Sequence, residues 1–99
     1  MSLLVRYTLK DAADHDHQVA AMEGLVADLN AEGIAGLDYS CFATAEATEF
    51  VGILEFPDDA TFKAFQASGA FAAYRERVGP TFANPPQTQG ITWIASTKG

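Results

Sequence analysis

Two hydrophobic periods alternate along the chain, and their order constrains the fold more than any other feature. Strand patterns, in which every second residue is apolar, occur over residues 2–9, 35–44, 48–56 and 91–97. Between the first two strands, apolar residues from Val19 to Leu29 recur at intervals of three and four, which is the spacing of a helix. A second helical region, 58–78, follows the third strand. The β-α-β-β-α(α)-β order predicts an α+β, ferredoxin-like fold with a four-stranded antiparallel sheet.

Local signals mark the ends of these segments. Asp14 is the expected cap of the first helix, and Gly33 is expected to end it. The Pro57-Asp58-Asp59 stretch stops a strand and begins a helix, and Ser68 is positioned to cap a further one. No internal repeat or linker divides the chain, so residues 1–99 are expected to form a single domain.

The strands carry apolar residues on both faces. Right-handed crossovers place the helices on one face of the sheet, which leaves the other face uncovered. The residues expected on that second face are Leu4, Val51, Ile53 and Ile94. A second copy of the chain is the economical cover for such a surface, which predicts a homodimer in the form of a dimeric α+β barrel.

The composition disfavours several classes of partner. A net charge of −7 with six basic residues argues against nucleic acid and anionic membrane surfaces. No segment approaches the roughly 20 apolar residues of a membrane span, and the N-terminus does not resemble a signal peptide, so a cytoplasmic location is expected. The single cysteine, Cys41, cannot form an internal disulfide and is expected to be a buried, inert thiol.

The stretch Asp14-His15-Asp16-His17 raises the question of a metal site. Residues two apart on a helix point about 200° away from each other, so His15 and His17 cannot share an ion once the helix has begun. The stretch is therefore interpreted as a helix start, and no metal is expected. A metal-binding pair carried by a loop, or one histidine reaching into the cavity, remains an alternative.

Several aromatic side chains combine an apolar body with a polar tip. Tyr7, Tyr39, Tyr74 and Trp93 suit the wall of a cavity for a hydroxylated aromatic ligand. Ordinary core packing is favoured for each of them alone, whereas the four together are explained equally well by a pocket. Arg6 interrupts an apolar strand, where it can pair with Glu55 inside the dimer or reach an anionic ligand.

One segment carries a family resemblance. The sequence FVGILEFPDDATFKAFQASGAFAAYRERV resembles the antibiotic-biosynthesis monooxygenase-like (ABM) proteins of the dimeric α+β barrel superfamily. An aromatic strand end leads into an acidic helix start, followed by the family's F-x-A-x-x-x-S-x-x-F-x-x-Y pattern. The matching residues are Phe62, Ala64, Ser68, Phe71 and Tyr74. The resemblance covers nearly the whole chain in element order and about a quarter of it in specific pattern.

The chain also departs from that family. Many relatives have Trp at the position of Phe56, and His at the positions of Phe65 and Ala70. The haem-degrading branch has Asn, Trp and His where this chain has Val5, Phe65 and Arg75. The resemblance therefore does not extend to haem degradation.

The resemblance implies a cofactor-independent monooxygenase that acts on a small aromatic or polyketide-like compound. Such enzymes need a dry aromatic cavity with a few polar groups, because the deprotonated substrate supplies the electrons. The expected cavity residues are Val5, Tyr7, Tyr39, Phe65, Phe71, Tyr74 and Trp93. A non-catalytic dimer that binds a small ligand, and a lyase, isomerase or cyclase with His17 or a tyrosine as proton carrier, are the alternatives.

Overall fold

The computed structural model describes residues 1–98 and contains one four-stranded sheet with three helices. The strands are β1 (Ser2–Thr8), β2 (Asp38–Ala43), β3 (Glu49–Glu55) and β4 (Gln87–Ile91). The helices are α1 (His15–Glu32), α2 (Asp59–Gln66) and α3 (Gly69–Val78), with 3₁₀ turns at Ala12–Asp14 and Gly79–Thr81. The strand order is β2-β3-β1-β4, and each neighbouring pair is antiparallel.

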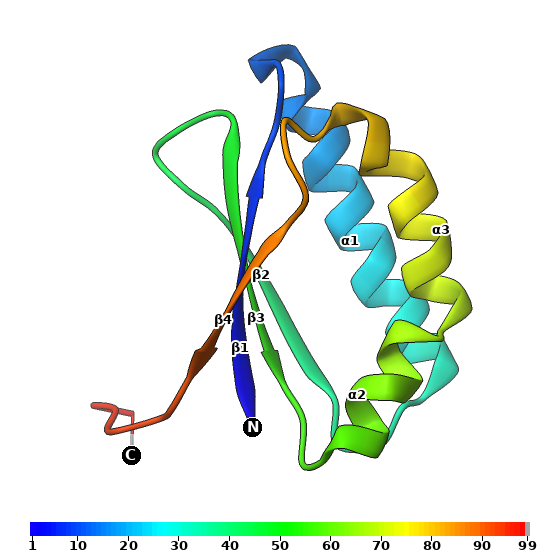
Figure 1. Cartoon of the computed structure of the whole chain (residues 1–99), viewed down its shortest axis with the longest axis vertical. Coiled ribbons are helices and arrows are strands. Elements are labelled where there is room, and N and C mark those ends of the chain that lie inside the picture. The colour runs from blue at the N-terminus through cyan, green and yellow to red at the C-terminus, as the bar shows by residue number, and fades with distance from the viewer. Residues whose placement is uncertain (99) are drawn as a thin grey trace.

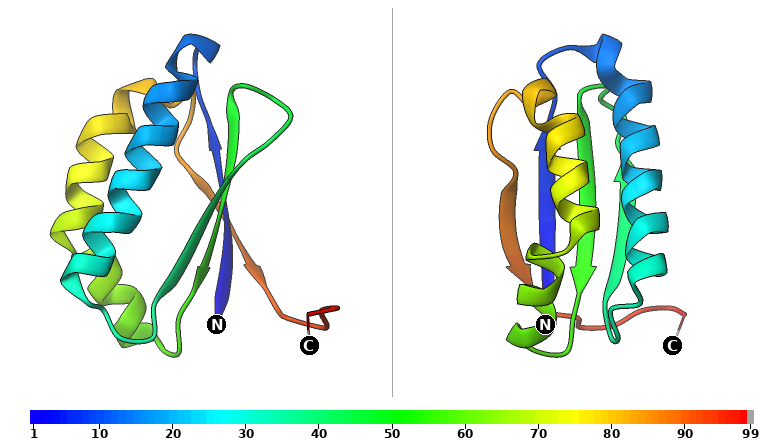
Figure 2. Two further views of the ribbon diagram at one scale, coloured as in Figure 1. Left: turned by 180° about the vertical axis from the view of Figure 1, so that it is seen from behind. Right: turned by 90° about the vertical axis from the view of Figure 1, so that its right-hand side faces the viewer.

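The molecule has two layers. All three helices cover the same face of the sheet, and the opposite face has no helix over it (Figures 1 and 2). The ferredoxin-like α+β fold predicted from the element order is therefore confirmed. We call the uncovered surface the open face of the sheet.

Alternation along the strands explains which side chains form the core. On β1, Val5 and Tyr7 are buried against the helices, and Phe50 and Leu54 do the same on β3. The helices contribute one buried side each to the same core. Their buried apolar residues are Ala21, Met22, Leu25, Leu29, Phe65, Ala70, Tyr74 and Val78.

The helix ends agree with the sequence signals at three of four positions. Asp58 and Ser68 accept hydrogen bonds from the backbone N–H groups of Thr61 and Phe71, and Gly33 ends α1 with a left-handed φ of 67°. The cap predicted at Asp14 is wrong. Asp11 accepts from the Ala13 N–H at 2.9 Å and begins a 3₁₀ turn, so that Asp14 lies inside the turn and caps nothing with its side chain.

The last strand lies earlier than predicted. β4 spans Gln87–Ile91 and pairs with β1 until Ile91 meets Ser2, where β1 itself begins. The predicted strand 91–97 has no neighbouring backbone beyond that point, and residues 92–98 leave the sheet and end in a turn at 97–98 (Figure 1). We call residues 92–98 the C-terminal arm. Trp93 and Ile94 on this arm are 68% and 89% exposed.

The open face is apolar along its middle. Leu4, Val51 and Ile53 lie there as predicted and are half-buried, next to the exposed Phe42 on β2 and to Ile91 on β4. Ile94 was wrongly predicted to belong to this face, because it lies beyond the end of the strand.

The charged positions of the open face do not pair within one chain. Arg6 is opposite Val51, whereas Glu55 is opposite Ser2, so the register keeps the two charges apart. Their pairing across two copies remains a prediction. Within residues 1–98, none of the helices is both long and apolar enough to cross a membrane.

Candidate functional site

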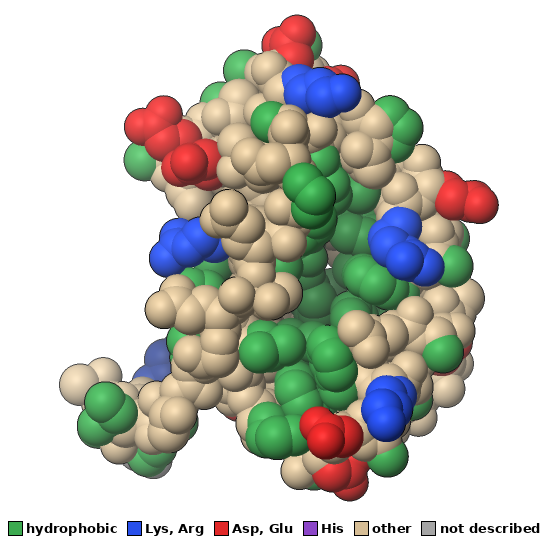
Figure 3. All heavy atoms as spheres, viewed as in Figure 1, with side chains coloured by type: hydrophobic (Ala, Val, Ile, Leu, Met, Phe, Trp, Pro, Cys, Tyr) green, Lys and Arg blue, Asp and Glu red, His purple; other side chains and the backbone are tan. Residues whose placement is uncertain are grey.

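A cavity of about 640 Å³ lies between the sheet and the α2–α3 pair. Figure 3 shows hydrophobic side chains lining this hollow, which opens between the two layers. The wall is formed by Leu3, Val5, Tyr7, Lys10, Tyr39, Leu54, Phe62, Phe65, Gln66, Phe71, Tyr74, Arg75, Gly79, Phe82, Ala83, Asn84, Pro85, Pro86 and Thr88. Its size and its largely apolar wall are those of a small-molecule site.

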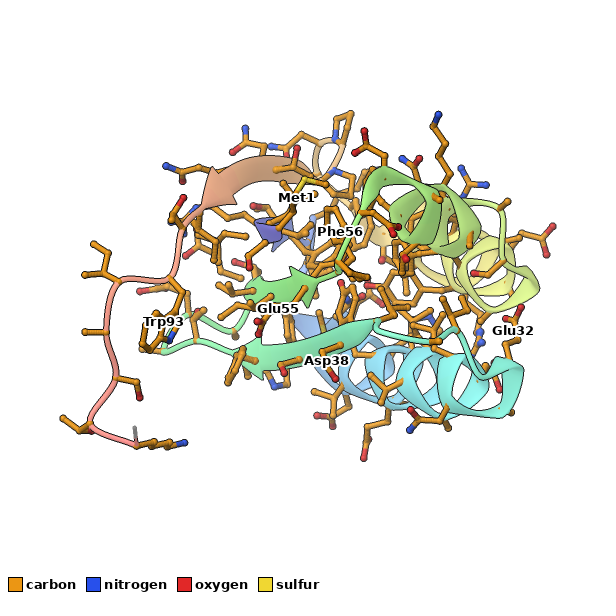
Figure 4. The ribbon with its side chains drawn as sticks, turned by 90° about the horizontal axis from the view of Figure 1, so that it is seen from below. Met1, Glu32, Asp38, Glu55, Phe56 and Trp93 are labelled. Carbon is orange, nitrogen blue, oxygen red and sulfur yellow. The ribbon has the colours of Figure 1, made fainter. Side chains whose placement is uncertain are left out.

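The structure brings together six of the seven residues expected at such a cavity. Val5, Tyr7, Tyr39, Phe65, Phe71 and Tyr74 all line it. Trp93 does not, because the arm that carries it projects from the open side of the sheet, away from α2 and α3 (Figure 4). The placement of Trp93 at the cavity was therefore wrong.

Stacked aromatic rings form the helix side of the cavity. The Phe65 ring lies 4.6 Å from that of Phe71 and 5.8 Å from that of Tyr39, measured between centroids. The guanidinium of Arg75 sits 5.0 Å above the Phe71 ring, where the cation is attracted to the ring face. These contacts hold the rings in a fixed order along the wall.

A loop that joins α3 to β4 supplies the third wall, which the helix and strand patterns of the sequence do not predict. Residues 79–86 are held to the end of β1 and to the residues just after it by backbone hydrogen bonds. Ala83 N–H donates to the Thr8 carbonyl at 2.8 Å, and Lys10 N–H donates to the Thr81 carbonyl at 2.9 Å. Phe82 packs its ring 5.5 Å from Tyr7. The phenylalanine and the three prolines of this loop are the signal that could have identified this wall.

Three tyrosine hydroxyls and one amide meet at the inner part of the cavity. The hydroxyls of Tyr7 and Tyr39 form a hydrogen bond with each other. The Nε2 of Gln18 donates to the hydroxyl of Tyr74 at 2.8 Å, and both of these side chains are fully buried. We call Gln18, Tyr7, Tyr39 and Tyr74 the hydroxyl cluster. The chain has three tyrosines, and all of them belong to it.

The hydroxyl cluster keeps unused hydroxyl protons and one unused acceptor, because the buried Oε1 of Gln18 has no hydrogen-bond partner among the described residues. The Tyr7–Tyr39 bond uses one of two hydroxyl protons, and the Tyr74 oxygen already accepts from Gln18, so its own proton is left to donate. Because the three tyrosines line the cavity, an oxygen acceptor on a ligand can take up these protons. The sequence contained a signal for Gln18, since it is a polar residue on the apolar stripe of α1, four residues before Met22.

The tyrosines stay protonated at neutral pH. Burial raises the pKa of Tyr7 to about 12, although the hydrogen bond with Tyr39 lowers this pKa in part. Burial also raises the pKa values of Tyr39 and Tyr74, and the neighbouring Tyr7 adds to both shifts. The cluster therefore acts as a set of neutral hydrogen-bond donors.

The charges on the wall favour an anion. Apart from the tyrosines, the ionisable side chains among the described residues that line the cavity are Lys10 and Arg75, both cationic. The cavity wall therefore carries positive charge, although the chain as a whole has a net charge of −7. A ligand that carries negative charge on an oxygen is thus matched by the wall cations and by the hydroxyl donors.

Gly52 makes room for the hydroxyl of Tyr39. A Cβ at this position of β3 would lie 2.7 Å from the Tyr39 hydroxyl oxygen and 3.1 Å from two ring carbons. Any larger residue would push the Tyr39 ring away from its hydrogen bond with Tyr7. The glycine therefore belongs to the support of the site, and a sequence pattern alone does not reveal it.

The two histidines lie outside the cavity and serve different contacts. The Nδ1 of His15 is 2.8 Å from the Ala47 carbonyl in the β2–β3 turn, whereas the Nε2 of His17 is 3.1 Å from the Arg77 carbonyl on α3. Among residues 1–98, no group of three His, Cys, Asp or Glu side chains gathers as a metal site. Cys41 is half-buried beside Tyr39, and burial raises the pKa of its thiol to about 12.

Comparisons with known proteins agree on the fold. No family model and no curated protein sequence matches the chain. Solved structures do match it, among them an antibiotic biosynthesis monooxygenase with a TM-score of 0.79 and 16% identity, over 95% of this chain and 98% of that one.

Two further structures are similar in the same way. PA3566 from Pseudomonas aeruginosa matches with a TM-score of 0.78 and 18% identity, over 95% of this chain and 93% of that one. Rv0793 from Mycobacterium tuberculosis matches with a TM-score of 0.77 and 14% identity, over 97% and 96%. The chain therefore has the fold of the antibiotic biosynthesis monooxygenases.

Proposed function

We propose that this protein is a cofactor-independent monooxygenase of the antibiotic biosynthesis type that oxidises a small, electron-rich hydroxyaromatic compound. The observation that carries the proposal is a group of neutral tyrosine hydroxyls with unused protons in an aromatic cavity whose other ionisable wall residues, among those described, are cationic. Such a site binds an aromatic ring by burial and its ionised oxygen by hydrogen bonds. The shared fold supports the assignment.

The chemistry can be written with 1-naphthol as the probe. The naphtholate transfers an electron to O₂, and the resulting radical pair combines to form a C–O bond at the ring carbon opposite the hydroxyl. Loss of water from this peroxide gives 1,4-naphthoquinone, so that C₁₀H₈O and O₂ become C₁₀H₆O₂ and H₂O. One oxygen atom enters the product, the other leaves as water, and the substrate supplies all the electrons.

In this proposal the residues of the cavity bind and stabilise the reacting anion. The rings of Phe65 and Phe71 bury the naphthalene, and the hydroxyls of Tyr7 and Tyr74 donate to its oxygen. Lys10 and Arg75 lower the cost of bringing the negative charge into the cavity. None of these groups is a base at neutral pH, so the ligand enters already ionised.

The test combines oxygen consumption with mass spectrometry of the product. The wild-type protein is expected to accelerate O₂ uptake by 1-naphthol over the uncatalysed reaction and to yield 1,4-naphthoquinone with one labelled atom from ¹⁸O₂. A variant that loses a hydroxyl far from the cavity, Thr44→Val in the β2–β3 turn, should behave as the wild type. If the protein binds the naphthol but leaves the rate unchanged, the activity is ruled out and a ligand-binding function takes its place.

That second function, non-catalytic binding of the same ligand class, is favoured by one observation. The described cavity wall has no carboxylate or histidine that could take a proton from a substrate. If binding is the whole function, the affinity for hydroxynaphthalenes should be high while oxygen consumption is absent.

The rate of oxidation is expected to increase with pH as the naphthol ionises, up to the pH at which the protein unfolds. A proton carrier on the protein, such as His17, would instead give a step whose position does not depend on the ligand. A pH profile of kcat/KM for 1-naphthol and for a more acidic, halogenated naphthol separates these outcomes. The step should shift with the acidity of the ligand, and a step at the same pH for both ligands would contradict the proposed role of the wall.

Replacing Tyr74 with phenylalanine is expected to weaken the binding of a hydroxynaphthalene by about 0.5–1.5 kcal/mol, the usual net contribution of one neutral hydrogen bond. Calorimetric titration is the suitable measurement, because Trp93 lies outside the cavity and would not report on it. Naphthalene without a hydroxyl is the matched control ligand and should bind both proteins equally. Equal binding of the hydroxylated ligand would exclude Tyr74 as its partner.

We further propose that two copies associate through their open faces. Leu4, Val51 and Ile53 form an apolar strip there, and Phe42 beside it is 49% exposed. A sheet with one solvated face is normally polar on that face. The same strip on a second copy covers it by two-fold symmetry.

Light scattering at micromolar concentration is expected to give twice the mass of the chain. Replacing Val51 by lysine should convert the protein to a monomer, because a charge would then lie in the middle of the strip. Glu49→Lys, which places the same charge on the same strand outside the apolar strip, is the control. A wild-type monomer would contradict the proposed dimer.

A further inference from the structure

Gln18 is a polar residue inside the apolar core. It lies on the buried side of α1 with Met22 and Leu25, and its side chain is fully buried. Within residues 1–98 the other buried polar side chain is Ser68, whose hydroxyl bonds backbone groups of neighbouring residues. The Gln18 amide, in contrast, makes its single hydrogen bond within the described chain to the side chain of Tyr74. Its polar role therefore concerns Tyr74 and not the helix that carries it.

Packing does not explain a glutamine at this position. The Oε1 of Gln18 is buried without a hydrogen-bond partner among the described residues, and such an oxygen lowers the stability of a fold. A methionine has nearly the same length and would fill the same space without a polar group. A buried amide that is satisfied at only one of its ends is typical of a functional site, where local rules of stability are broken.

The direction of the hydrogen bond determines what Tyr74 can do. The Nε2 of Gln18 donates to the Tyr74 oxygen at 2.8 Å, and an amide N–H cannot accept the hydroxyl proton. That proton therefore points away from Gln18. Tyr74 lies on the cavity wall, in an edge contact with the ring of Tyr7, so the remaining side of its hydroxyl is the side of the cavity.

We propose that Gln18 is a positioning residue that keeps Tyr74 as a donor towards the cavity, and that it thereby makes the site prefer the ionised form of a hydroxyaromatic ligand over the neutral form. Gln18 is not among the described residues that line the cavity, so it acts through Tyr74 and does not touch the ligand. This inference deepens the proposed function and rests on the ligand class named there.

The preference follows from the hydrogen bonds that each form of the ligand needs. A naphtholate oxygen carries no proton and accepts the bond that Tyr74 donates. The neutral hydroxyl has a proton of its own to donate, and the Tyr74 oxygen already accepts from the Gln18 amide. Burial in the cavity disfavours the charged form, but this effect is the same when residue 18 is an apolar residue of similar size. A comparison of variants therefore isolates the contribution of Gln18.

The test is an anaerobic pH titration of protein-bound 2,4-dichloro-1-naphthol, whose absorbance differs between its ionised and neutral forms. This probe is more acidic than 1-naphthol, so it ionises at a lower pH than the tyrosines. Gln18→Met removes the amide at nearly constant volume. Met22→Leu, one turn further along the same buried side of α1 and away from the cavity wall, is the matched control.

Gln18→Met is expected to reduce the preference for the ionised probe about three- to ten-fold, the usual effect of one hydrogen bond, which appears as a higher pKa of the bound probe. Met22→Leu should leave this pKa at the wild-type value. In a Tyr74→Phe protein, adding Gln18→Met should also leave it unchanged, because the hydroxyl through which Gln18 acts is missing. The double variant should be more stable than Tyr74→Phe alone, in which the buried amide has lost its partner.

Equal pKa values of the bound probe in the wild type and in Gln18→Met would overturn the inference. An equal increase with and without the Tyr74 hydroxyl would also overturn it, because such a change comes from altered packing. Neither result depends on oxidation of the ligand. If the predicted difference is found but 1-naphthol causes no O₂ uptake, the monooxygenase activity is ruled out and the role of Gln18 stands. A wild-type protein that binds neither form of the probe would overturn both.

Discussion

Raising the pH above about 10 is expected to unfold the protein in one steep transition. All three tyrosines lie in the hydroxyl cluster, and burial raises the pKa of each, to about 12 for Tyr7. In the unfolded chain they ionise near pH 10, whereas in the folded chain they keep their protons. Stability is thus fully present below pH 10 and is lost as the pH increases towards the folded-state pKa values.

The size of this effect follows from linkage. Each tyrosine ionised only in the unfolded state lowers the free energy of unfolding by about 1.4 kcal/mol per pH unit, so three together lower it by about 4 kcal/mol per unit. Absorbance of tyrosinate and circular dichroism should therefore change at the same pH. Tyr39→Phe should reduce the slope by about one third. Stepwise ionisation of tyrosines in a protein that stays folded would contradict the burial of the cluster.

Replacing Gly52 with valine is expected to destabilise the fold and to displace Tyr39. The new Cβ would meet the Tyr39 hydroxyl at 2.7 Å, and overpacking of a core commonly costs about 1–3 kcal/mol. Valine favours strands, so a loss of stability would come from this contact and not from local propensity. The loss should appear in chemical unfolding, together with weaker binding of hydroxynaphthalenes.

Gly90 provides the matched control. It lies on β4 opposite Leu3, and a Cβ there would meet nothing within 4 Å. Gly90→Val should therefore leave both stability and ligand binding nearly unchanged. The smaller substitution Gly52→Ala should also lower the stability. Adding Tyr39→Phe to it should recover part of the lost stability, because the oxygen that clashes with the new Cβ is removed. Equal effects of valine at both glycines would show that the contact with Tyr39 is unimportant.

Most of the fold was predictable because its elements follow from local pattern. The alternation of Val5 and Tyr7 on β1, and the three-and-four spacing on α1, specify which side of each element is buried. Asp58 and Ser68 mark helix starts through a hydrogen bond that forms within three residues. Such signals do not depend on distant parts of the chain.

The errors share a different cause. The segment 91–97 has the sequence of a strand, but whether it becomes one depends on a neighbouring backbone, and β1 begins only at Ser2. Asp14 has the sequence context of a helix cap, but Asp11 begins a 3₁₀ turn that includes Asp14. In both cases the local preference is sound, and the outcome is decided by what lies next to it in space.

For the candidate site, the sequence predicted the ring-bearing wall better than its polar centre. The alternation of side chains along β1 places Tyr7 on the side of the sheet that faces the helices. The helical spacing in α2 and α3 places Phe65 and Tyr74 on the helix sides that face the sheet. The pairing of Gln18 with Tyr74 joins residues 56 positions apart, and the fit of Tyr39 over Gly52 depends on atomic distances. Neither could be read from the order of residues.

The loop 79–86 is held by main-chain atoms, and this has a consequence for how the ligand preference can change. The hydrogen bonds from Lys10 N–H to Thr81 and from Ala83 N–H to Thr8 do not depend on which side chains the loop carries. Residues 84–86, which form the rim of the cavity just beyond these anchors, can be exchanged without removing an anchor. This short stretch is therefore the natural place to graft segments from other proteins of the same fold and to select for new ligands. The hydroxyl cluster and the hydrophobic core would stay unchanged in such variants.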